Sequence, residues 1–163
     1  MSALLQNWPI FYAYETASSL LFTANIPTKL PRSIVVIDSC KWWDVAKARY
    51  MPQYPGVYEV FMSHFHYTVV ASAVVSADIY KNGAQFRAVN SSPGANCNHV
   101  ATNHTLIQMN GSTDYLEFYA VSTSTYTSGS AAASTNNSWI TLVDPWIDIS
   151  NGPWENAGVQ NYS

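Results

Sequence analysis

The most constraining feature of this chain is a hairpin signal near its middle. Asn82-Gly83 lies between two β-rich stretches, 76–81 and 85–89. An Asn-Gly pair between such stretches is the strongest short-range signal for a two-residue β-hairpin, because both residues accept the positive φ angles that the turn requires. The sequence therefore predicts antiparallel strands that are joined by tight turns.

A second hairpin is expected between strands at 105–109 and 115–121, with its turn at 110–114. Since side chains alternate across a strand, the second of these strands has one apolar face suited to a core, which is formed by Leu116, Phe118 and Ala120. The opposite face carries two tyrosines and suits packing against a neighbouring subunit. Candidate interface residues on this face are Tyr115 and Tyr119.

Further strands are predicted on both sides of these hairpins. Aromatic or β-branched runs predict strands at 11–14, 33–38 and 138–143. Residues 57–75 fit either two strands with a bend or one long bulged strand. Residues 17–23 fit either a short strand or a turn of helix.

The remaining long segments are expected to be loops. Residues 40–49 read as a connection that has room for one helical turn, 90–104 as a polar loop and 122–138 as a loop rich in Ser, Thr and Ala. No helical periodicity of useful length and no internal repeat occurs. The predicted fold class is all-β, an antiparallel β-sandwich of the jelly-roll type.

The composition points to a surface that other subunits cover. Charged residues make up 10% of the chain, against roughly 25% in ordinary globular domains. Aromatic residues make up 14%. Protein interfaces are depleted in Lys, Glu and Asp and enriched in Tyr and Trp, so this balance favours an oligomer or a larger assembly.

Charge and hydropathy argue against two classes of partner. The net charge is -3 and the Lys and Arg residues are scattered, whereas a nucleic-acid backbone requires a concentrated positive face. The longest apolar run, at 67–75, has about nine residues, and a membrane-spanning helix needs about 20. We therefore expect neither nucleic-acid binding nor membrane insertion.

Several short motifs occur in the order of a known superfamily. They are Pro55-Gly56-Val57-Tyr58, Ile79-Tyr80-Lys81-Asn82-Gly83, the stretch from Gly111 to Phe118 and Trp139-Ile140-Thr141-Leu142. This order resembles the tumour-necrosis-factor-like superfamily, especially the complement globular-head branch and its phage and bacterial relatives. The third motif departs from the family pattern, because the usual Gly-Asp is replaced here by Gly111-Ser112-Thr113-Asp114. The resemblance implies a jelly roll that assembles as a tight homotrimer and serves as a binding or structural module.

The resemblance covers about residues 11–143 and divides the chain into three parts. Residues 1–10 are expected to form an N-terminal arm, 11–143 the jelly-roll domain and 144–163 a C-terminal extended tail. Buried aromatic side chains often anchor one protein on another. The candidate anchors in the arm and tail are Trp8, Trp146, Trp154 and Tyr162.

Candidate chemistry is sparse. His64 and His66 share one face of a strand and are candidates for the trimer interface, but two histidines without a nearby carboxylate are weak grounds for a metal site. The chain has no Gly-x-Ser-x-Gly nucleophile motif, and its Asp residues are dispersed. Cys40 and Cys97 are expected to be free thiols. We therefore expect no enzyme activity, no cofactor and no metal.

The favoured functional hypothesis is a non-enzymatic virion structural protein. It would be a trimeric cement or decoration protein of a tailed phage that docks on the major capsid protein, or on other virion proteins, through its termini. The N-terminus lacks a signal-peptide pattern, so synthesis in the host cytoplasm and final location on the capsid surface are expected. The alternative is the receptor-binding tip of a phage head or tail fibre, with exposed Tyr and Trp residues stacking on a host surface glycan.

Overall fold

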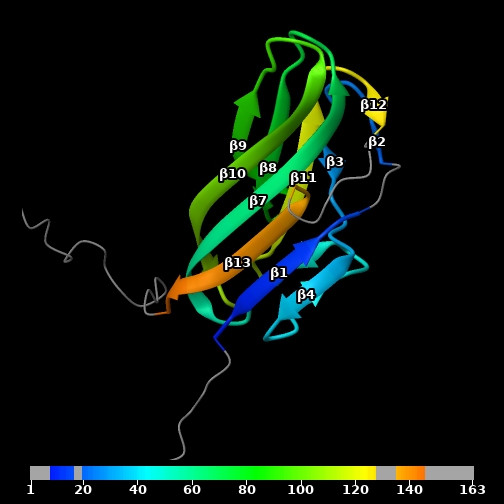
Figure 1. Cartoon of the computed structure of the whole chain (residues 1–163). Coiled ribbons are helices and arrows are strands. Elements are labelled where there is room, and N and C mark those ends of the chain that lie inside the picture. The colour runs from blue at the N-terminus through cyan, green and yellow to red at the C-terminus, as the bar shows by residue number, and fades with distance from the viewer. Residues whose placement is uncertain (1–7, 17–19, 128–134, 146–163) are drawn as a thin grey trace, which may run out of the picture.

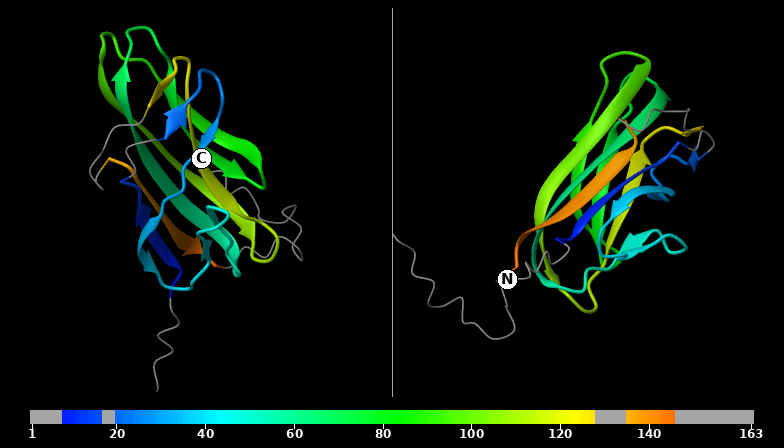
Figure 2. Two further views of the ribbon diagram at one scale, coloured as in Figure 1. Left: turned by 90° about the vertical axis from the view of Figure 1, so that its right-hand side faces the viewer. Right: turned by 60° about the horizontal axis from the view of Figure 1, so that its bottom comes forward.

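The computed structural model describes residues 8–16, 20–127 and 135–145. Within these ranges all regular structure is β, and two antiparallel sheets pack face to face (Figures 1 and 2). The prediction of an all-β antiparallel sandwich is therefore confirmed.

The first sheet has five strands in the order β10-β7-β13-β1-β4, and it faces the viewer in Figure 1. Its longest strand, β7, pairs with the edge strand β10 along almost its whole length. The strand bounds, in this order, are Cys97–Asn110, Pro55–Val69, Asn137–Asp144, Ile10–Tyr14 and Ile34–Asp38.

The second sheet has the order β5-β6-β11-β8-β9, and β3 adds to β11. The bounds in this order, with β3 last, are Trp43–Asp44, Arg49–Tyr50, Leu116–Ser122, Val75–Lys81, Ala84–Ser91 and Thr28–Lys29. A separate ribbon joins β2 (Leu21–Phe22) to β12 (Tyr126–Thr127).

The core lies between the two sheets. The apolar face predicted for the strand at 115–121 is buried there, since Leu116, Phe118 and Ala120 are all 0% exposed. The first sheet supplies alternate side chains from its own strands, including Phe11, Tyr58, Val60, Met62, Ile107 and Ile140. Burial of this set supplies most of the free energy that holds the layers together.

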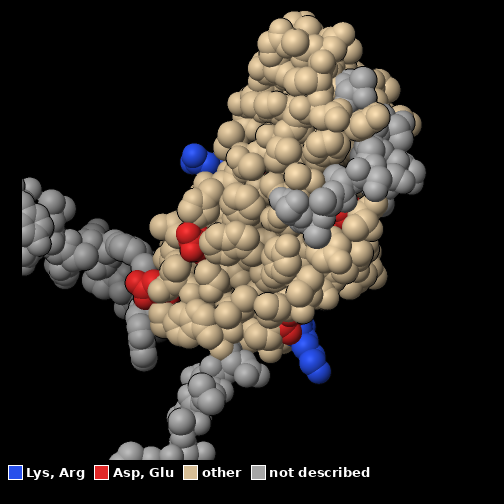
Figure 3. All heavy atoms as spheres, viewed as in Figure 1, with Lys and Arg blue, Asp and Glu red and all other residues tan. Residues whose placement is uncertain are grey.

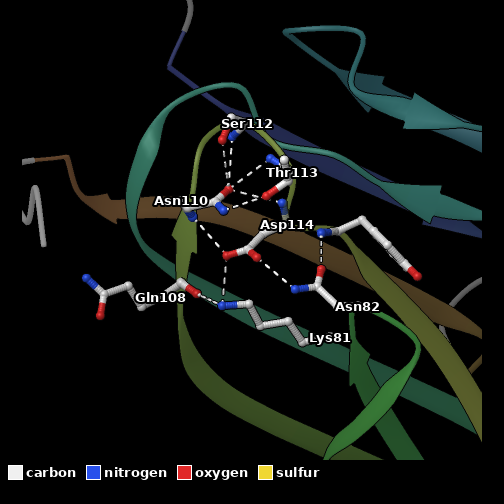
Figure 4. A network of polar contacts seen from close by, with 8 residues as sticks. Lys81, Asn82, Gln108, Asn110, Ser112, Thr113 and Asp114 are labelled. Atoms are coloured by element: carbon white, nitrogen blue, oxygen red, sulfur yellow. Dashed lines mark hydrogen bonds and ion pairs between the residues drawn. The ribbon is translucent and has the colours of Figure 1, made fainter. Parts of the chain in front are cut away.

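The predicted Asn82-Gly83 hairpin is confirmed, and a polar network ties it to the second turn (Figure 4). Both residues have positive φ, at 54° and 77°. The side-chain amide of Asn82 donates to a carboxylate oxygen of Asp114 at 2.8 Å, and the Lys81 ammonium lies 2.8 Å from the other. In the second turn the Asn110 side-chain oxygen accepts the backbone N–H groups of the next turn residues, Ser112, Thr113 and Asp114.

Two glycines allow close backbone packing at one end of the first sheet. Gly56 and Gly111 have φ of 152° and 70°. A Cβ on Gly56 would overlap the carbonyl oxygen of Asp144, and one on Gly111 would overlap the backbone nitrogen of Pro55. The backbone at Pro55-Gly56 therefore lies close to both the Gly111 turn and the end of β13, and neither glycine has room for a side chain.

Two segments that were expected to be loops are mainly strand. The predicted loop at 90–104 is wrong, because β9 continues to Ser91 and β10 begins at Cys97. The segment reads as polar because Asn103 occupies a core position, where its amide donates to the backbone carbonyls of Ala77 and Arg87. The predicted connection at 40–49 contains the β5–β6 hairpin rather than a helical turn.

Other boundaries shift less. The open choice for 57–75 resolves into one long strand, β7, followed by a turn before β8. Within 17–23 the described part is the strand β2, and the predicted loop at 122–138 contains β12 and the start of β13. Residue Ile10 of the predicted arm already belongs to β1, and Asp144 of the predicted tail still belongs to β13.

Candidate functional site: an aromatic face on the five-stranded sheet

The outer face of the five-stranded sheet is aromatic and apolar. It is formed by the residues that alternate with the core residues along each strand. We call this surface the aromatic face, and it consists of Ile10, Tyr12, Ile37, Phe61, Phe65, Tyr67, Val100, Leu106, Trp139 and Val143. The exposed fraction reaches 59% at Leu106 and 47% at Tyr67.

One row of this face crosses all five strands. In the registers of the strand pairs, Ile37 lies opposite Tyr12, Tyr12 opposite Trp139, Trp139 opposite Phe61, and Phe61 opposite His104. The rings of Phe61 and Trp139 stack, with centroids 6.0 Å apart and an interplanar angle of 18°. Directly opposed side chains are the closest neighbours on a sheet surface, so the row is a continuous strip.

A polar contact between His104 and Glu59 interrupts the apolar surface. His104 Nε2 lies 2.7 Å from Glu59 Oε1, and both side chains come from the outer face of adjacent strands. The His104 ring also lies 6.1 Å from the Trp139 ring. The Glu59 carboxylate is thus paired within its own chain, which lowers the cost of covering it.

Figure 3 views this face and shows few charged side chains on it. The basic groups in that view lie at the margin, and most of the visible surface carries neither Lys, Arg, Asp nor Glu. Large contiguous apolar patches on a soluble protein mark sites of interaction. The aromatic face is therefore the strongest candidate for an interaction site among the described residues.

The expectation that His64 and His66 lie at a subunit interface is wrong. They are 2% and 0% exposed within a single chain, because residues 58–66 place their even-numbered side chains in the core. Burial, with further contributions from His66 and Arg32, holds the pKa of His64 well below its usual value. Burial, together with His99, lowers the pKa of His66 to about 3. Both rings are therefore neutral core residues at pH 7.

Tyr115 and Tyr119 belong to the other sheet. Tyr119 packs on Tyr80 with ring centroids 4.2 Å apart, and the Arg49 guanidinium lies 4.8 Å from the Tyr115 ring. Both tyrosines are partly exposed. Their role in an interface stays a prediction, and they lie on a different sheet from the aromatic face.

Of the four predicted anchors, the structure describes Trp8. Its indole N–H donates to the backbone carbonyl of Leu142 at 2.8 Å, while 47% of the residue stays exposed. Trp8 is thus held against β13, next to the aromatic face. The other three anchors, Trp146, Trp154 and Tyr162, lie outside the described residues.

Sequence reasoning missed the residues at the centre of the aromatic face. Phe61 lies in a long run whose two faces both look apolar, so alternation alone does not separate core from surface. Tyr12 and Trp139 become neighbours only through the pairing of the first and last strands. The available signal was the excess of aromatic over charged residues, which indicates such a face without locating it.

The described residues contain no group of three or more His, Cys, Asp or Glu side chains that could hold a metal ion. Cys40 and Cys97 form no disulfide bond. No helix in the described parts of the chain is long and apolar enough to cross a membrane.

Comparison with known proteins identifies the fold. No family model matches the sequence, and no curated protein matches it. Among solved structures, the globular domain of a zebrafish complement 1qA protein is similar, with a TM-score of 0.56 and 9% identity over 83% of this chain and 97% of that one. An Eiger TNF from S. frugiperda has a TM-score of 0.56 and 9% identity over 85% and 94% of the two chains. Murine APRIL has a TM-score of 0.55 and 7% identity over 83% and 99%.

These likenesses agree with the predicted fold class. Identity below 10% carries no information on activity or partners, but the coverage includes nearly all of each solved domain. The chain has an all-β, tumour-necrosis-factor-like jelly-roll fold.

Proposed function

We propose that this chain is a non-enzymatic assembly module that forms a homotrimer through its aromatic face. The observation that carries the proposal is the row from Ile37 through Tyr12, Trp139 and Phe61 to His104. An apolar strip of this width on an isolated chain exposes surface whose burial is worth about 25 cal/mol per Å². Interfaces between copies of one chain are the most apolar class of protein interface.

The proposal names a second copy of the chain as the partner for two reasons. The low content of charged residues is a property of the whole chain and fits a molecule that is normally covered. The order of sequence motifs and the tumour-necrosis-factor-like fold both support three-fold association over other symmetries.

Substitution on the face tests the assembly. Phe61→Asp places a carboxylate in the middle of the row, and burying an unpaired charge is strongly unfavourable. We expect association to weaken by at least about a hundredfold, or about 3 kcal/mol, in analytical ultracentrifugation. The matched control is Phe86→Asp, which changes an exposed phenylalanine on β9 of the other sheet.

The two variants give opposite results if the face is the interface. Phe61→Asp should sediment as a monomer with an unchanged β-sheet circular dichroism spectrum, and Phe86→Asp should sediment like the wild type. Equal association of both variants, or equal loss, would contradict the proposal.

Within this frame, the specific role that we propose is a cement or decoration protein on the capsid surface of a tailed phage. Low charge and the aromatic residues of the arm and tail support it. Trp8 is exposed over 47% of its surface although its indole N–H is fixed to β13, so its ring is held in place and available. In this role Trp8 acts with Trp146, Trp154 and Tyr162 to contact the major capsid protein.

Deletion of residues 146–163 tests the docking step. The deletion starts beyond β13, whose last residue is Asp144, so the sandwich keeps all of its described strands. We expect the truncated protein to keep its oligomeric state and to lose its place on purified capsids, measured by co-sedimentation. Unchanged capsid occupancy would contradict the role on the virion and leave the assembly proposal standing.

A further inference from the structure

A shallow pocket of about 350 Å³ lies beside the β5–β6 hairpin, at the end of the six-stranded sheet. This volume falls at the lower end of the range for small-molecule sites. Its lining consists of three apolar or aromatic residues, Trp42, Trp43 and Met51, and three polar or charged residues, Lys41, Asp44 and Gln53.

The backbone under the pocket is fixed from both sides. The carboxylate of Asp38 accepts the backbone N–H groups of Trp42 and Trp43 at 3.1 and 2.8 Å. On the other side, the backbone N–H of Met51 donates to the carbonyl of Trp42 at 2.9 Å. The two tryptophans therefore have defined positions before any ligand arrives, which reduces the ordering cost of binding.

Aromatic contacts also fix the plane of the half-buried Trp42 indole. The Tyr54 ring lies 5.1 Å away at an interplanar angle of 82°, and the Tyr50 ring lies 6.0 Å away at 64°. Edge-to-face packing of this kind is a favourable aromatic geometry. Trp42, which lines the pocket, is thus held in place by its ring contacts with Tyr50 and Tyr54.

Two buried donors of the β5–β6 hairpin have no acceptor among the described residues. Trp43 is 8% exposed, and its buried indole N–H has no acceptor among the described residues. The same holds for the hydroxyl of Tyr50, the register partner of Trp43. Both atoms are buried, so a ligand in the open pocket would contact the lining side chains and not these two donors.

The charges of the lining select the class of ligand. The ammonium of Lys41 and the carboxylate of Asp44 have opposite signs, and Asp44 is only 3.7 Å from the ammonium of Lys47. A strongly anionic or cationic ligand would meet one unfavourable partner. A neutral ligand that carries both donors and acceptors would not.

We propose that this pocket binds a neutral pyranose unit of a saccharide. A pyranose ring has an apolar C–H face that packs on an indole, and its hydroxyl groups both donate and accept hydrogen bonds. In this arrangement the C–H face lies on Trp42, and the ring hydroxyls contact Asp44, Gln53 and Lys41. The site is separate from the aromatic face, so the proposal does not depend on trimer formation.

Titration with free sugars tests the site. The probes are glucose, galactose, mannose and N-acetylglucosamine, with glycerol as a control that has hydroxyl groups but no ring. Chemical shifts of the indole N–H signals are followed by NMR in the full-length protein. We expect a saturable shift of the Trp42 and Trp43 signals with at least one sugar, at a Kd of about 1 mM or weaker, and none with glycerol.

Variants locate the binding. Trp42→Ala should weaken binding at least about tenfold, which is about 1.4 kcal/mol. Gln53→Ala changes an exposed rim residue and should weaken it about threefold without affecting the fold. Phe86→Ala, on β9, is the matched control and should leave binding unchanged.

The proposal is overturned by any of three results. The first is the absence of a saturable shift with all four sugars, and the second is an equal response to glycerol. The third is unchanged affinity in Gln53→Ala, when Trp42→Ala either also keeps its affinity or fails to fold.

Discussion

Asp114 is a carboxylate that the fold buries and uses to join two turns (Figure 4). Burial by itself raises the pKa of this carboxyl. Hydrogen bonds from Asn82, Lys81 and the backbone of Asn110, together with the charge of Lys81, outweigh burial and hold the pKa below its ordinary value. The ionised form is therefore the one that the folded state stabilises.

Asp114→Asn should lower the free energy of unfolding by about 1–3 kcal/mol, because it removes a partly buried ion pair and leaves the Lys81 ammonium without its carboxylate. Chemical denaturation at pH 7 measures the loss. The control is Asp44→Asn, whose partner Lys47 is 61% exposed at its side chain, and which should cost at most about 0.5 kcal/mol. A similar loss of unfolding free energy in both variants would show that the Asp114 network stabilises the fold no more than an exposed ion pair does.

The buried histidines predict acid sensitivity. The folded state holds the pKa values of His64 and His66 below the unfolded value of about 6.5, so the unfolded chain binds more protons between about pH 6.5 and 3. The contribution of these two histidines to stability is fully present above about pH 6.5 and is lost as the pH falls below that value. Each histidine contributes a slope of up to about 1.4 kcal/mol per pH unit.

His64→Leu should reduce by one the number of protons that the chain takes up on unfolding. The measurement is the difference in unfolding free energy between pH 7 and pH 5, which should be smaller in this variant than in the wild type. The groups around the pair that also carry charge or titrate are Arg32, His99 and Tyr126, whose hydroxyl is hydrogen-bonded to the ring of His66. His104→Gln is the control, because His104 lies on the surface beside Glu59. An unchanged slope in His64→Leu would contradict the assignment of a neutral buried ring.

At the scale of elements, the close approach of Gly111 to Pro55 joins the turn after β10 to the start of β7. Gly111→Ala should lower the unfolding free energy by more than about 2 kcal/mol, because the added Cβ would overlap the backbone at Pro55 and φ is 70°. Gly94→Ala is the matched control, since nothing lies within 4 Å of its Cβ position. In thermal denaturation, Gly111→Ala should melt at a clearly lower temperature than Gly94→Ala. Equal melting temperatures would show that the close packing of Gly111 against Pro55 does not restrict this position.

The sequence predicts the elements whose signals are local. The Asn82-Gly83 turn follows from the residues that accept positive φ, and the core face of β11 follows from simple alternation. The first half of β10 was missed because the side-chain NH₂ of the buried Asn103 donates to two carbonyls from the other sheet, and these partners are unknown before the sheets are placed. The β5–β6 hairpin was missed because each strand has only two residues.

The site was harder to predict than the fold. The aromatic face depends on which strands become neighbours, and β1 and β13 come from opposite ends of the chain. The histidines at positions i and i+2 suggested a role at a subunit interface, but the face of β7 that carries them packs in the core. The composition showed an excess of aromatic over charged residues, and only the strand pairing gathers several of the aromatic residues on the outer face of the five-stranded sheet.

At the scale of the whole molecule, the two sheets differ in what they expose. The five-stranded sheet presents the aromatic face with the His104–Glu59 contact on it, and the six-stranded sheet carries partly covered tyrosines with Arg49 and Lys29 close to them. This asymmetry suits a ring in which the same sheet of every subunit faces its neighbours and the other sheet faces outward.

The most direct test of this account is the mass of the wild-type chain in solution, measured by light scattering after size-exclusion chromatography. The account predicts a species of three chains of 18.0 kDa each that persists on dilution. A single chain of 18.0 kDa at all concentrations, with the aromatic face left in contact with water, would contradict it.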